Sequence, residues 1–132
     1  MFLTNECDYA MRVIRALANG TKRTVKEIAS EENIPERFAY KIIRKLRLAG
    51  YVRVTNGRFG GVSLRQPLET ITLANLMNAI DSERYLNICL GNNSECVFKD
   101  NVSRKCAIHQ ELLRIQNLLM SALSSKTMDA ML

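Results

Sequence analysis

Three amphipathic helical patterns lie in close succession within the first 50 residues, and this order constrains the fold more than any other feature. Gly20 and Pro35 follow the first and second patterns, at points where helices end or break. Thr24 and Glu27 have the spacing of a capping box, and Gly50 stands where a glycine ends a helix. The sequence therefore predicts three helices joined by short turns, over residues 5–18, 25–32 and 36–49.

Two strand-like stretches follow the third helical pattern. Residues 51–55 and 62–65 alternate between apolar and polar side chains, and the glycine-rich residues 56–61 between them are typical of a hairpin turn. Three helices followed by a hairpin is the element order of a winged helix-turn-helix, a fold whose basic helix enters the major groove of DNA. The fold class expected is therefore mainly α with a small β-hairpin wing.

The charge of the chain is concentrated in its first half. Residues 1–66 hold 13 Lys and Arg against 6 Asp and Glu, a net +7, whereas residues 67–132 hold 6 against 7, a net −1. This asymmetry indicates a polyanionic partner for the first half, nucleic acid before an anionic membrane. No apolar run approaches the ~20 residues of a membrane span, and charged residues interrupt the start of the chain. We expect a cytoplasmic protein.

The outer face of the third predicted helix carries the candidates for DNA reading. Arg37, Tyr40 and Lys41 lie in its first turns, from which side chains of a recognition helix reach base edges. Arg44 and Lys45 lie further along and are expected to hold phosphates, which position the protein without specifying sequence. Each of these side chains could instead be ordinary solvated surface, but their grouping on one face favours DNA.

The glycine-rich turn supplies one further DNA-binding candidate. Arg58 is expected to enter a narrow minor groove, where the negative potential is enhanced. Its glycines permit positive φ angles and a close approach of backbone to phosphate. The alternative is a hairpin turn with an incidental arginine.

The second half of the chain predicts two more helices, over residues 72–81 and 107–123, and a short docking segment in the tail 124–132. The longer helix has an apolar strip with coiled-coil steps of 4, 3, 4 and 3, formed by Ile108, Leu112, Ile115, Leu119 and Ala122. Such a strip is typical of self-association and equally of a core-facing stripe. Both interpretations stay open.

The polar stretch 89–109 holds three of the four cysteines and the only histidine. In a reducing cytosol a disulfide framework is disfavoured, so metal ligation, redox sensing and inert thiols remain. Iron–sulfur clusters use thiolates with an occasional histidine. Structural zinc sites use close pairs such as CxxC, which this stretch lacks. Cys89, Cys96 and Cys106 are therefore candidate ligands of a metal or cluster.

A fourth ligand has three candidates. His109 lies three residues after Cys106, on the same face of a helix that begins there. Asp8 lies on the polar side of the first helix and could instead pair with Arg12. Cys7 falls on the apolar side of that helix, where a core thiol is the better interpretation.

The chain resembles the Rrf-two family of winged-helix transcription regulators, particularly its iron–sulfur members of the IscR and NsrR type. The resemblance covers nearly the whole chain, and its specificity lies in the order and spacing of the pieces. They are "DYAMRVIRALA" (8–18), "VKEIASEENIPERFAYKIIRKLRLAGYV" (25–52), "GRFGGVSL" (57–64), "ITLANLMNAID" (71–81) and "CAIHQELLRIQNLL" (106–119).

The resemblance implies a homodimer paired through long helices that binds a palindromic operator in double-stranded DNA. It divides the chain into a winged helix-turn-helix DNA-binding domain, residues 1–66, and a cluster-binding loop with a dimerisation helix, residues 67–132. It further implies that Cys89, Cys96 and Cys106 bind iron, with His109 or Asp8 of the partner subunit as fourth ligand. The gaps between these cysteines are longer than those common in the family.

The function expected is that of a DNA-binding transcription regulator, a repressor, sensing redox, nitric oxide or iron–sulfur status through a 2Fe–2S or 4Fe–4S cluster. The alternative is a cluster-free DNA-binding regulator with a cysteine thiol switch or a zinc site. An enzyme is not expected, because the sequence offers one histidine and no recognisable pairing of nucleophile and base.

Overall fold

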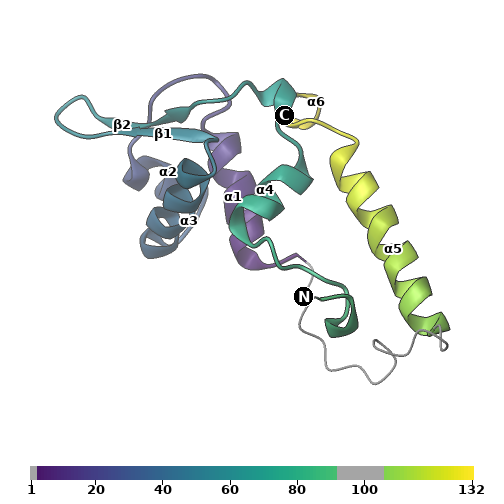
Figure 1. Cartoon of the computed structure of the whole chain (residues 1–132). Coiled ribbons are helices and arrows are strands. Elements are labelled where there is room, and N and C mark those ends of the chain that lie inside the picture. The colour runs from purple at the N-terminus through teal and green to yellow at the C-terminus, as the bar shows by residue number, and fades with distance from the viewer. Residues whose placement is uncertain (1–2, 92–105) are drawn as a thin grey trace.

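A computed structural model describes residues 3–91 and 106–132 of the chain. Figure 1 shows a head of short helices, a hairpin projecting from one side of it and a long helix standing along the other. In chain order the elements are α1 (Asn5–Ala16), α2 (Val25–Glu31), α3 (Glu36–Leu48), β1 (Val52–Thr55), β2 (Gly61–Leu64), η1 (Leu68–Thr70), α4 (Leu73–Ile80), η2 (Ile88–Leu90), α5 (Ala107–Ser124) and α6 (Met128–Met131). The mainly helical fold with a hairpin wing is confirmed.

Helix α1 is the central element of the head, and it packs against both α3 and α4. Its apolar face is fully buried at Cys7, Ala10, Val13 and Ile14. The small side chain of Ala10 lets a neighbouring helix approach closely, and Cys7 behaves as a small apolar residue. The prediction that Cys7 is a core thiol is confirmed.

Helices α2 and α3 begin and end at local signals that the sequence made visible. The predicted capping box is present, because Thr24 N–H donates to Glu27 Oε2 at 2.8 Å and Glu27 N–H donates to Thr24 Oγ1 at 3.2 Å. Between the helices Asn33 adopts a left-handed φ of 51°. Gly50 has a φ of 85° just after α3, as expected of a glycine that ends a helix.

The wing is an antiparallel hairpin that is tied to the segment before α2. β1 and β2 pair in a register that sets Val54 opposite Val62. Arg23 and Val62 exchange two backbone hydrogen bonds of 2.9 and 2.7 Å, which extends the pairing to a third segment. Gly61 has a φ of 155°, and a Cβ there would lie 2.9 Å from the Arg23 carbonyl oxygen. The wing therefore has a fixed base beside α2.

The C-terminal tail docks onto the head, as predicted. Met128 N–H donates to the Ile71 carbonyl at 2.7 Å, and the Met128 side chain is only 3% exposed within the core. Helix α4 begins immediately after this contact, with a capping box formed by Thr72 and Asn75. The tail thus holds the start of α4 in place.

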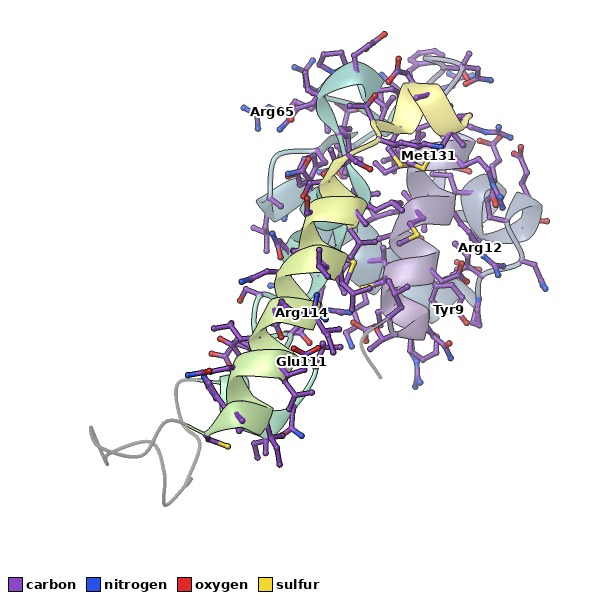
Figure 2. All side chains as sticks on the ribbon, turned by 90° about the vertical axis from the view of Figure 1, so that its right-hand side faces the viewer. Tyr9, Arg12, Arg65, Glu111, Arg114 and Met131 are labelled. Carbon is purple, nitrogen blue, oxygen red and sulfur yellow. The ribbon has the colours of Figure 1, made fainter. Side chains whose placement is uncertain are left out.

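Helix α5 contacts α4 and η2 but stands at the edge of the molecule, where Figure 2 looks directly onto it. Within the described chain, none of its side chains is buried. Ile108 and Leu118 are 72% and 57% exposed, and Ile115 and Leu119 are 36% and 37% exposed. The apolar strip of α5 is therefore not buried in the core of a single chain. Among the described residues, no helix has the length and apolar character that a membrane span requires.

The docked tail gives a stability prediction. Met128→Ala is expected to lower the free energy of unfolding by about 2–5 kcal/mol, because it empties a buried site at the start of α4. Met131→Ala is the matched control, since Met131 is 39% exposed and its truncation should cost far less. Urea denaturation at fixed protein concentration measures both. Equal losses for the two variants would contradict the buried role of Met128.

Candidate nucleic-acid interface and metal site

The predicted reading residues lie on the outer face of α3. The opposite face of the helix is buried against the head at Ala39, Ile42, Ile43 and Leu46. Arg37 and Arg44 are exposed, and Tyr40 is 53% exposed. We call Arg37, Tyr40, Lys41 and Arg44 the basic face of α3. The structure brings these four side chains to one exposed helix face.

Arg37 has an aromatic support. Its guanidinium lies 5.3 Å from the centre of the Phe38 ring, a distance typical of cation–π contacts. The Phe38 ring in turn packs against Tyr9 of α1, with ring centres 5.9 Å apart. The side chain that begins the basic face is thus linked through one ring to the central helix.

Lys41 and Lys45 are held by a carboxylate of α1. Glu6 forms ion pairs with both lysines, and the distance from Lys45 Nζ to Glu6 Oε2 is 2.8 Å. Lys45 also donates to the Ile80 carbonyl at 3.0 Å, at the C-terminus of α4 where a cation is favoured. Hydrogen bonds from Lys41 and Lys45 hold the pKa of Glu6 below its ordinary value of 4.5. Sequence reasoning missed this cluster, because Glu6 is 35 and 39 residues away from the lysines.

A cavity of about 590 Å³ opens beside this cluster. It lies between the start of α1, the flank of α3 and the end of α4, and it is lined by Thr4, Asn5, Glu6, Lys41, Lys45, Ile80, Asp81 and Arg84. The lysine side chains therefore border open space on one side and the carboxylate on the other.

The wing tip presents an arginine and an aromatic ring. Arg58 is exposed, as predicted, and its guanidinium lies 5.7 Å from the centre of the Phe59 ring. Phe59 is itself 84% exposed, and its carbonyl accepts a hydrogen bond of 3.2 Å from Lys22 Nζ. A Cβ at Gly60 would lie 2.3 Å from the Thr55 carbonyl oxygen, so the turn requires glycine there. Neither Lys22 nor Phe59 was singled out from the sequence, although an aromatic beside turn glycines was a visible signal.

Two of the three predicted thiol ligands lie within the described residues. Cys89, in η2, and Cys106, just before α5, are free and partly exposed, and Cys96 lies outside the described residues. His109 is in the first turn of α5 and is partly exposed. Over residues 3–91 and 106–132, no three metal-binding side chains come together. The thiol donors suit iron or zinc chemically, and Cys96 remains the third predicted ligand.

Asp8 lies on the exposed side of α1, where it makes the ion pair with Arg12 that was the alternative to its ligand role. Asp8 Oδ2 is 2.8 Å from Arg12 Nη2. The other nitrogen, Arg12 Nη1, donates to the Glu32 carbonyl at 3.0 Å, at the end of α2. Figure 2 shows Arg12 beside Tyr9 on α1, and the guanidinium lies 5.9 Å from that ring. A single arginine therefore joins Asp8 to the turn that precedes α3.

The sequence profile of the Rrf2 family, described as an iron-dependent transcriptional regulator, matches residues 3–132. The chain belongs to the Rrf2 family of transcriptional regulators. It is 30% identical over 132 residues to protein aau3 of Rhizobium meliloti, a match covering 98% of this chain and 83% of the relative. It is also 30% identical over 116 residues to the HTH-type transcriptional regulator NsrR of Geobacillus kaustophilus, covering 85% and 79%. The family is one of regulators and not of enzymes, as expected.

Solved structures agree on the Rrf2 fold. CymR, the global cysteine regulator of B. subtilis, superposes with a TM-score of 0.74 at 22% identity, covering 96% of this chain and 92% of CymR. IscR of T. potens gives a TM-score of 0.74 at 16% identity, covering 98% and 84%. At these identities the likeness establishes the winged-helix fold alone.

The cluster around Glu6 gives a prediction for the pH dependence of stability. Because the pKa of Glu6 is depressed in the folded state, its pairing stabilises at neutral pH and the stabilisation is lost as the pH falls below about 4.5. Glu6→Gln should lower the free energy of unfolding at pH 7 by about 1 kcal/mol or less. The difference from wild type should close in acid. Chemical denaturation across this range, with Glu69→Gln in η1 as control, measures it. A difference that persists unchanged at low pH would contradict the assignment.

Proposed function

We propose that this Rrf2-family regulator is a cytoplasmic repressor that binds a palindromic operator as a homodimer and senses an iron–sulfur cluster. The observation that carries the sensing part is the pair of free, partly exposed thiols, Cys89 and Cys106, on either side of Cys96 in the sequence. The DNA-binding part is supported by family membership and by the basic face of α3 with the wing beside it.

In this proposal α3 enters the major groove and the wing contacts the adjacent minor groove. Arg37, Tyr40 and Lys41 read base edges, Arg44 holds a phosphate, and Arg58 enters the minor groove. Phosphate contacts supply most of the affinity, whereas base contacts supply the sequence preference. The two roles can therefore be separated by measurement.

The homodimer is proposed to form through α5. Ile108, Ile115 and Leu119 of the predicted apolar strip stay exposed in the single chain, at the edge of the molecule. A second copy of the same helix would cover this strip with matching spacing. The dimer would present two recognition helices to two half-sites of the operator.

The cluster is proposed to be held by Cys89, Cys96 and Cys106, with Asp8 of the partner subunit or His109 as fourth ligand. A bound cluster would supply a centre that reacts with oxidants or nitric oxide. What this chain contributes is the link to DNA binding, because Asp8 is paired to Arg12 and Arg12 to the end of α2. Recruitment of Asp8 as a ligand would remove the partner of Arg12 and disturb the turn before α3. The separation of the two recognition helices would then change.

A second candidate function is a DNA-binding regulator without a cluster, using a thiol switch or zinc. The same free thiols support it, since exposed thiolates can be oxidised reversibly. A solved structure of the same fold is the oxidised form of CymR of Staphylococcus aureus, with a TM-score of 0.73 at 22% identity. Metal content distinguishes the two candidates.

Substitution of basic residues tests the reading assignment. Arg37→Ala is expected to weaken operator binding by about 1–3 kcal/mol while changing the affinity for random DNA little. Arg44→Ala should weaken both and reduce the dependence of log K on log salt by about 1. Lys126→Ala, beyond α5, is the control for loss of a cation. Fluorescence anisotropy over a salt series measures all three. Equal losses of operator and random binding for Arg37→Ala would show that Arg37 does not read bases.

Anaerobic purification tests the cluster. Wild type is expected to be brown, with iron and acid-labile sulfide, and Cys89→Ser, Cys96→Ser and Cys106→Ser should lose both because thiolates hold the iron. Cys7→Ala should keep them, since Cys7 is fully buried in the core. Mössbauer spectra of Asp8→Ala and His109→Ala identify the fourth ligand as the residue whose loss changes the signal. Colourless wild type that contains zinc or only free thiols would favour the second candidate.

A further inference from the structure

We propose that Glu6 is a specificity-determining residue of the DNA interface, which masks Lys41 and Lys45 from DNA that is not docked in register. This inference rests on the proposed DNA binding and adds a residue on α1 to an interface otherwise formed by α3 and the wing. It follows from the Glu6 carboxylate, which the structure pairs with two lysines of α3.

Glu6 pairs with two lysines of α3 at once. Each oxygen of Glu6 accepts a hydrogen bond from a different lysine, Oε1 from Lys41 and Oε2 from Lys45. The Glu6 side chain is 25% exposed, whereas Lys41 and Lys45 are 52% and 32% exposed. The carboxylate is thus the more covered partner. Two cations of the proposed DNA-binding helix share one negative charge.

Glu6 and Lys45 are fixed in place, whereas Lys41 is free to move. Glu6 lies in the first turn of α1, whose opposite face is locked in the core, and Lys45 is also bound to the Ile80 carbonyl. Lys41 has a long flexible stem and borders the cavity of about 590 Å³. Lys41 can therefore exchange Glu6 for another anion without disturbing the core.

The pairing with Glu6 changes how much each lysine can contribute to DNA affinity. Random DNA offers phosphates in every register, and non-specific affinity grows with the number of free cations. A lysine that is already neutralised gains little by moving to a badly placed phosphate. When the operator places a base edge or phosphate well, that group fully replaces Glu6 as the partner of the lysine. Specificity is a difference of affinities. A carboxylate that weakens binding to random DNA more than binding to the operator therefore raises the specificity.

The experiment compares Glu6→Gln with Glu69→Gln, which removes the same charge from exposed η1 outside this cluster. The probes are a 30-base-pair duplex of random sequence and an operator selected by wild type from a randomised library. Glu6→Gln is expected to bind the random duplex several-fold more tightly, with a slope of log K against log salt steeper by about 0.9 to 1.8. Operator affinity should rise less, so the ratio of operator to random affinity falls several-fold. Glu69→Gln should leave the ratio unchanged.

A second background separates masking from general effects of the substitution. When Lys41 is already replaced by Gln, Glu6→Gln should raise the affinity for the random duplex less than it does in wild type, because one of the two masked cations is gone. An equal rise in both backgrounds would overturn the proposal. The proposal would also be overturned if Glu6→Gln and Glu69→Gln had the same ratio of operator to random affinity. A loss of both the operator and the random affinity in Glu6→Gln, with an unchanged melting temperature, would overturn it as well.

Two further outcomes remain interpretable. If Glu6→Gln does not fold, Glu6→Asp takes its place, because it keeps the charge but is too short to hold both lysines. The ratio of operator to random affinity should again fall. An unchanged ratio overturns the proposal. If wild type shows no preference for any selected sequence, the proposed operator binding fails. The random-duplex comparison then still tests the masking of the lysines by itself.

Discussion

The buried apolar face of α1 is the constraint on which the rest of the structure depends. Cys7, Ala10, Val13 and Ile14 are completely covered, and α3 and α4 pack on either side of them. Apolar burial of this kind is the dominant favourable term in folding. Because α1 is fixed in this way, its polar residues are fixed as well. Because α3 packs against this helix, α1 helps to set the orientation of the proposed DNA contacts on α3.

The exposed side of α1 places two carboxylates at different positions relative to α3. Glu6 reaches the two lysines on the flank of α3, and Asp8 reaches Arg12, which binds the end of α2. Both acids therefore act on the helix-turn-helix, one through its charge and the other through the turn before α3. In the proposed regulator, a change of state at Asp8 would reach the turn before α3 through Arg12.

Much of the fold could be predicted from the sequence, because helix periodicity, the capping box at Thr24 and the glycine-rich hairpin are local signals. The contacts that position the site could not. Periodicity indicates which face of a helix is buried but not which residues pack against it. The pairing of Glu6 with Lys41 and the burial of Met128 in the core could therefore not be predicted. The division into domains at residue 66 and the ligand role of Cys96, which lies outside the described residues, stay predictions.

In the proposed dimer, two copies of the head, held together through α5, read two half-sites of one operator. Hydroxyl-radical footprinting of the selected operator tests it most directly. Two symmetric protected segments are expected, with centres about 10 base pairs, or a multiple of one helical turn, apart on the same face of the duplex. A single protected segment at saturating protein, or two with no fixed spacing, would contradict it.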